Sequence, residues 1–159
     1  MSTFHEEVDK LRALYPQERS AVMPVLRLAQ EEHGGWLPPE ALEQVAGALD
    51  LTPAQVEAVA SFYDMFFLEP VGRHVVEVCT NVSCCLVGAL DVVAAFEQEL
   101  DCRLGETSPD GTATLRSVEC LGGCGWGPVV SVDHRYLEHF TPDDARTVVA
   151  GLRSGEGGH

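Results

Sequence analysis

The sequence is poor in positive charge and contains a single lysine, Lys10. Lysine and arginine together number 10 against 25 acidic residues, so the formal net charge is −15. Such a surface repels polyanions, which argues against a nucleic-acid partner. The acidity either keeps the protein in solution or favours docking on a more basic subunit, and charge alone does not separate the two readings.

Long hydrophobic runs are also missing. No apolar stretch approaches the roughly 18–20 residues that a membrane-spanning helix needs. The segment 1–15 is acidic and amphipathic and has neither the basic nor the apolar region of a secretion signal. These absences predict a cytoplasmic protein without direct membrane insertion, one that reaches the inner face of the cell membrane only through a partner.

Several catalytic signatures are absent as well. The sequence contains no phosphate-binding P-loop, no G-x-G-x-x-G after a strand and no Ser/His/Asp arrangement, so it predicts neither an NADH site nor a flavin site. A C-x-x-C pair is also missing, which argues against a thiol–disulfide oxidoreductase.

The residues that are present predict an α+β protein in two parts. Within 1–70, apolar residues recur at helical spacing, and capping signals at Thr3, Pro39 and Thr52 open helices, so we expect an N-terminal helical bundle. A second helix is expected over 19–32, beginning or kinking near Pro24. The aromatic residues Phe62, Tyr63, Phe66 and Phe67 are expected to pack at the end of the bundle.

From residue 71 to 159 the pattern changes to strands and helices. Strands are expected at 74–78 and 113–119, with a helix between them that opens at Cys84 and Cys85. The expected apolar face of that helix includes Val87, Leu90, Ala94 and Leu100. A hairpin over 129–137, a helix over 141–152 and a frayed tail over 154–159 follow. This β-α-β order makes the first two strands parallel and is that of a thioredoxin-like α/β domain with a mixed sheet.

Four of the six cysteines form two close pairs, Cys79-x4-Cys84 and Cys120-x3-Cys124. Each pair follows an expected parallel strand, so both pairs should meet at one edge of the sheet. Structural zinc sites favour C-x2-C spacing, whereas these wider gaps suit a [2Fe–2S] cluster with two metal centres. A structural zinc module remains the alternative. Gly122, Gly123, Gly125 and Gly127 would bring backbone N–H groups close to the sulfurs of a negatively charged cluster.

The motifs 79–84 (CTNVSC) and 119–124 (ECLGGC) resemble the thioredoxin-like [2Fe–2S] ferredoxin family. Its members include the NuoE-type subunit of NADH:quinone oxidoreductase, respiratory complex I. The resemblance extends upstream through 23–26, 35–37 and 61–63.

The resemblance implies a one-electron-transfer subunit that holds a single [2Fe–2S] cluster on Cys79, Cys84, Cys120 and Cys124. It further implies a partner flavoprotein of the NuoF type, which binds FMN and NADH, together with other iron–sulfur subunits of the peripheral arm. This chain would carry no catalytic site for NADH. The same family supplies diaphorase subunits of NAD-linked hydrogenases and formate dehydrogenases, which remain an alternative host. Cys85 is expected to pack at a helix start, and Cys102 to act as a small hydrophobic residue.

Overall fold

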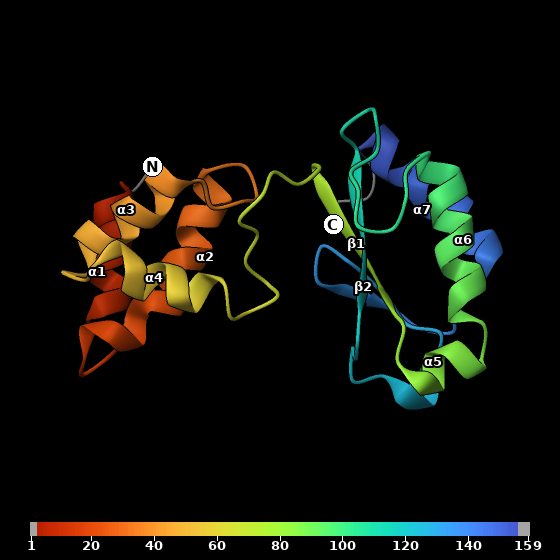
Figure 1. The fold of residues 1–159 in the computed structure, drawn as a ribbon, viewed down its shortest axis with the longest axis horizontal. Coiled ribbons are helices and arrows are strands. Elements are labelled where there is room, and N and C mark those ends of the chain that lie inside the picture. The colour runs from red at the N-terminus through yellow and green to blue at the C-terminus, as the bar shows by residue number, and fades with distance from the viewer. Residues whose placement is uncertain (1–2, 156–159) are drawn as a thin grey trace. The chain divides into compact units, whose positions relative to one another are not determined.

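The computed structural model describes residues 3–155 and divides into two compact units (Figure 1). The helical unit comprises Met1–Pro70 and the sheet unit comprises Val71–His159. Among the described residues, no helix combines the length and apolar character needed to span a bilayer. Helices and a mixed four-stranded sheet together confirm the predicted α+β class.

Within residues 3–70, the helical unit contains four α-helices and one short 3-10 turn. These are α1 (Phe4–Arg12), η1 (Glu18–Ala21), α2 (Val22–Glu32), α3 (Pro39–Ala48) and α4 (Pro53–Ala60). Thr3 and Thr52 each accept a hydrogen bond from the backbone of the third helical residue and form a capping box, as the sequence predicts. Helix α2 begins two residues before Pro24, where proline is tolerated because no intrahelical N–H is lost. Helix α2 contacts α1, α3 and α4 and so lies at the centre of this core.

The prediction for the aromatic stretch after α4 is only partly confirmed. Phe66 is buried in the core, but the side chain of Phe62 is 77% exposed and Tyr63 is exposed as well. Helix α4 ends at Ala60, so the residues that follow leave the helical stripe on which the prediction depended. Phe62 and Tyr63 instead contact each other edge to face, with ring centroids 5.0 Å apart.

The sheet unit is built on four strands in the order β2-β1-β3-β4. The strands are β1 (His74–Cys79), β2 (Ala113–Val118), β3 (Val130–Val132) and β4 (Arg135–Leu137). Strand β1 pairs parallel with β2 and antiparallel with β3, and β3 pairs antiparallel with β4. The parallel pair and the hairpin are therefore confirmed.

The described part of the sheet unit also contains three helices and one 3-10 turn: α5 (Val82–Leu86), α6 (Ala89–Leu100), η2 (Cys124–Trp126) and α7 (Pro142–Ser154). Helices α6 and α7 contact each other and lie on one side of the sheet (Figure 1). Their apolar side chains and the facing side chains of β1, β2 and β3 form one core. The predicted tail begins within α7, and residues 156–159 lie outside the described part of the chain.

The helix expected after Cys84 is interrupted, so the predicted apolar face is wrong. Gly88 adopts φ +101°, a left-handed conformation that suits glycine, and it separates α5 from α6. The break changes the helical phase, so Val87, Leu90 and Ala94 are exposed. The buried face of α6 consists of Ala89, Val92, Val93, Phe96 and Leu100, of which the sequence predicted only Leu100.

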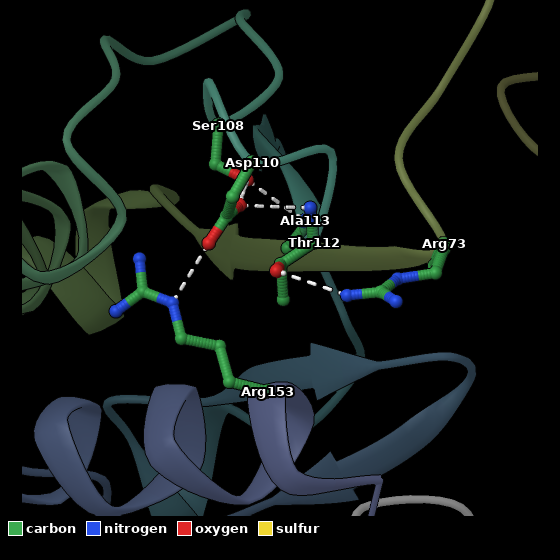
Figure 2. Close-up of polar contacts among 6 residues, drawn as sticks. All are labelled: Arg73, Ser108, Asp110, Thr112, Ala113 and Arg153. Atoms are coloured by element: carbon green, nitrogen blue, oxygen red, sulfur yellow. Dashed lines mark hydrogen bonds and ion pairs between the residues drawn. The ribbon is translucent and has the colours of Figure 1, made fainter.

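A polar turn before β2 joins that strand to α7 (Figure 2). The Asp110 carboxylate accepts hydrogen bonds from the Ser108 hydroxyl at 2.6 Å, the Thr112 backbone N–H at 2.9 Å and Arg153 Nε at 2.9 Å. The Ser108 hydroxyl also accepts a bond from the backbone N–H of Ala113. These donors, the Ser108 hydroxyl foremost, hold the pKa of Asp110 well below its ordinary value.

Candidate metal centre

Strands β1 and β2 bring the two cysteine pairs to the same edge of the sheet. Because the strands run parallel with Cys79 opposite Val118, both end at that edge, and Cys120 follows two residues after β2 ends. The backbone N–H of Cys79 donates to the Val129 carbonyl at 3.0 Å, and the N–H of Thr80 donates to the Val118 carbonyl at 2.9 Å. Cys79 is therefore held between β2 and the residue that leads into β3.

Cys84 packs beside Cys79 beneath the surface. It is the third residue of α5, it is only 1% exposed, and it forms a small apolar cluster with Cys79, Ala89 and Val129. Burial raises the pKa of the Cys84 thiol, and a backbone hydrogen bond from Val129 opposes part of that rise. The Cys79 side chain lies within hydrogen-bonding reach of Cys84, and Cys124 is near enough to interact electrostatically.

Cys120 and Cys124 lie on the glycine-rich loop that follows β2, and both are exposed. Gly122 adopts φ +75°, and its backbone N–H donates to the Cys120 Sγ at 3.3 Å. Further along, the N–H of Trp126 donates to the Gly123 carbonyl at 2.9 Å and closes the turn η2. This loop therefore already directs a backbone N–H at one of the candidate sulfur ligands, as the hydrogen bonds that tune iron–sulfur clusters require.

Two glycines lie where an added side chain would meet close neighbours. A Cβ on Gly123 would lie 2.8 Å from Val129 Cγ2, and one on Gly127 would lie 3.3 Å from the Cys84 Sγ. Gly125, in contrast, has no atom within 4 Å of such a Cβ. Close packing of the backbone against other protein atoms is thus found at Gly123 and Gly127 and not at Gly122 or Gly125. The approach of all four glycines to a cluster stays a prediction.

The structure brings the four candidate ligands together only in part. Cys79 and Cys84 are in contact and Cys124 is nearby, but within residues 3–155 no three His, Cys, Asp or Glu side chains are grouped so as to hold a metal ion. The donor set nevertheless fits a [2Fe–2S] cluster, because four cysteine sulfurs supplied from one sheet edge match its ligand requirement. An exposed glycine-rich loop allows the second pair to approach the first.

The segments that form this edge carry no charged side chain. Residues 80–90 and 120–132 contain no Asp, Glu, Lys, Arg or His, although 22% of the whole chain is Asp, Glu, Lys or Arg. Large apolar side chains are exposed there, with Leu86 81% and Trp126 53% exposed. We define the apolar rim by the exposed large hydrophobic residues of these segments, Val82, Leu86, Val87, Leu90 and Trp126.

Sequence reasoning missed this surface, and only the absence of charge over 80–90 and 120–132 could have indicated it. Val87 borders the loop directly, because a Cβ on Gly127 would lie 3.2 Å from Val87 Cγ2. The short helix α5 and the turn η2 lie beside each other at this end of the sheet unit (Figure 1). Large exposed apolar patches are a common feature of interaction sites.

The two remaining cysteines have other surroundings. Cys85 is half-buried, and its thiol donates to the Thr80 carbonyl at 3.1 Å. Cys102 follows α6, belongs to the core of the sheet unit and has a pKa raised by burial and then by the nearby Glu106 carboxylate. The prediction that Cys102 acts as a small hydrophobic residue is confirmed.

Comparison with known proteins places the chain among iron–sulfur proteins. The family model described as thioredoxin-like [2Fe–2S] ferredoxin matches residues 8–153. A subunit of the NADH-quinone oxidoreductase of Rhizobium meliloti (strain 1021) is 45% identical over 144 residues, which cover 91% of this chain and 84% of the relative. A subunit of the NADH-quinone oxidoreductase of Thermus thermophilus is 39% identical over 162 residues, 98% of this chain and 89% of the relative.

A solved structure shares the fold. The crystal structure of an NAD+-reducing [NiFe]-hydrogenase in the air-oxidized state matches with a TM-score of 0.71 at 19% identity. The match covers 82% of this chain and 23% of the hydrogenase chain. At this identity the likeness concerns the fold alone.

Proposed function

We propose that the chain, which belongs to the thioredoxin-like [2Fe–2S] ferredoxin family, is the one-electron-transfer subunit in the NADH-dehydrogenase module of NADH:quinone oxidoreductase. A [2Fe–2S] cluster is its cofactor. The single observation that carries the proposal is the match of the family model to almost the whole chain, with both cysteine pairs within it. The names and high coverage of the relatives from Rhizobium and Thermus support the host complex.

The proposed ligands are Cys79, Cys84, Cys120 and Cys124. When bound, the cluster supplies the capacity to accept and release one electron. The protein holds the first two sulfurs on β1 and α5 and the other two on the glycine-rich loop. Backbone N–H groups of Gly122 and Val129 are directed at the sulfurs of Cys120 and Cys84, where they offset negative charge and so tune the reduction potential.

The proposed electron-exchange partner is a flavoprotein subunit of the NuoF type that binds FMN and NADH, with further iron–sulfur subunits in the same complex. The apolar rim supports this, because docking of an apolar partner surface there would exclude water beside the candidate ligands. The complex would hold the chain at the inner face of the cell membrane. The alternative host is an NAD-linked hydrogenase or formate dehydrogenase, in which the chain would be the equivalent diaphorase subunit. Isolation of the native complex and identification of its other subunits distinguishes the hosts.

Single cysteine replacements test the ligand set. Replacement of Cys79, Cys84, Cys120 or Cys124 by alanine should abolish or severely reduce the visible absorption and the bound iron and sulfide, because one iron loses a ligand. Matched controls are Cys85→Ala and Cys102→Ala, which should keep a spectrum close to that of the unaltered protein. Retention of the native spectrum by Cys120→Ala, or its loss in Cys102→Ala, would overturn the assignment.

A further inference from the structure

The two candidate ligand pairs differ sharply in their access to solvent. Cys79 is 2% exposed and Cys84 is 1% exposed, and the two pack against Ala89 and Val129. Cys120 and Cys124, on the loop after β2, are both exposed. A molecule that approaches from solvent can therefore touch the second pair directly, whereas it reaches the first pair only after local opening of the chain.

We infer that this asymmetry sets the order in which the chain acquires its cluster. Cys120 and Cys124 capture a [2Fe–2S] unit first, from a donor that holds it on thiolates, and Cys79 and Cys84 complete the ligation afterwards. The inference rests on the ligand set proposed above. It goes further by assigning different tasks to the pairs, with capture by the loop pair and enclosure by the buried pair.

Each step of the transfer exchanges one ligand of iron for another, with atoms and charges in balance. One cysteine thiol replaces one donor thiolate on iron, so one Fe–S bond forms as another breaks. The proton of the cysteine thiol passes to the departing donor thiolate. After four such exchanges the donor is released as four thiols, both bridging sulfides remain on the irons, and no electron has been transferred.

The glycine-rich loop also suits the second stage, in which Cys79 and Cys84 complete the ligation. Its positions 123 and 127 already lie against Val129 and Cys84, because a Cβ at either position would contact those side chains at 2.8 and 3.3 Å. Val129 in turn accepts the backbone N–H of Cys79 at 3.0 Å. Gly125, between these anchored points, has open space around it. A captured cluster is thus held next to the buried thiols, and completion requires only a local rearrangement.

Cluster transfer to the full-length metal-free chain tests the order, with the [2Fe–2S] complex of glutathione as the donor. Two double variants are compared, Cys79→Ser/Cys84→Ser and Cys120→Ser/Cys124→Ser. The first should capture the donor at close to the rate of the unaltered chain and should retain two glutathiones, visible in native mass spectra as a mixed-ligand species. The second should react at least about tenfold more slowly, since its remaining thiols are buried. Cys85→Ser is the matched control and should transfer normally.

If a double variant fails to fold, timed alkylation with iodoacetamide tests the order of ligation on the unaltered chain, because it measures how accessible each cysteine is. In the unaltered metal-free chain, Cys120 and Cys124 should be modified at least about tenfold faster than Cys79 and Cys84. Equal alkylation rates, or capture by the Cys120→Ser/Cys124→Ser chain as fast as by the unaltered chain, would overturn the order while leaving the ligand set intact. Failure of the unaltered chain to take up any cluster would instead overturn the proposed ligand set.

Discussion

Gly127 lies against Cys84, close enough that a Cβ at position 127 would be 3.3 Å from the Cys84 Sγ. This contact joins the glycine-rich loop to the buried cysteine pair. The same Cβ would lie 3.2 Å from Val87 Cγ2 and 3.6 Å from the Cys84 Cα, so α5 and its C-cap residue lie close against this position. The absence of a side chain at Gly127 thus leaves room for the Cys84 sulfur where it lies.

We expect Gly127→Ala to weaken cluster retention. The added methyl group must displace Cys84 or Val87 by a few tenths of an ångström, which strains one proposed ligand and should accelerate loss of the cluster several-fold. The measurement is the decay of visible absorption in the presence of an iron chelator. Gly125→Ala is the matched control, because no atom lies within 4 Å of a Cβ there. Equal decay rates for both variants would show that the close approach has no consequence for the cluster.

The apolar rim should contribute to partner binding more than to folding. Leu86→Ala and Trp126→Ala remove side chains that are mostly exposed, so thermal unfolding should change little. Binding to the flavoprotein subunit, measured by titration calorimetry, should weaken by about 1–4 kcal/mol for each variant if these residues are interface hot spots. Leu14→Ala, which removes an exposed leucine of the helical unit, is the control. Unchanged affinity in both rim variants would exclude the rim from the interface.

The Asp110 turn should make stability depend on pH in the acid range. The pKa of Asp110 is lowered on folding, so its contribution is fully present above the ordinary value of 3.8 and is lost as the pH falls toward the folded-state pKa. Asp110→Asn should therefore lower the melting temperature at pH 7, and the difference from the unaltered protein should narrow at about pH 3. Glu57→Gln, which neutralises an exposed carboxylate of α4, should show no such narrowing. A difference that stays constant with pH would argue against the ionised Asp110 as the cause.

Residues 71–159 alone should assemble the cluster, since all four proposed ligands and their packing partners belong to the sheet unit. When reduced, this fragment should give the electron paramagnetic resonance signal of a [2Fe–2S] protein. It should bind the flavoprotein subunit more weakly than the full chain, because it lacks exposed aromatic side chains such as Phe62. A fragment that cannot hold iron would mean that the two units depend on each other for folding. Undiminished binding would limit the helical unit to a role in stability.

Much of the fold could be predicted from local sequence signals. Capping boxes at Thr3 and Thr52 and the β-branched run before Cys79 mark elements whose causes lie within a few residues, and the structure has each of them. The placement of Cys79 and Cys120 at one edge of the sheet followed from a general rule for parallel strands.

The wrong predictions arise where one backbone angle or the end of one helix interrupts the periodic pattern of apolar residues. A single glycine such as Gly88 can lie within a helix, so the sequence does not show a break there. Only the positive φ of Gly88 reveals that the helix is interrupted at this residue. The exposure of Phe62 depends on where α4 ends, which periodicity does not determine to the residue. The rim around Leu86 and Trp126 was missed because a continuous helix was expected there, with Val87 and Leu90 on its buried face.

Strand β1 occupies an interior place in the sheet, between β2 and β3. A displacement of Cys79 along or away from the strand would break backbone hydrogen bonds on both flanks, to the Val129 carbonyl and through Thr80 to the Val118 carbonyl. One proposed ligand, Cys79, is thereby fixed at the end of an interior strand, whereas Cys120 and Cys124 belong to a loop outside the sheet. Changes in bond length that accompany each gain or loss of an electron should therefore be absorbed on the loop side. The amide protons of Cys79 and Thr80 should then exchange with deuterium far more slowly than those of Gly122 and Gly125 in either oxidation state.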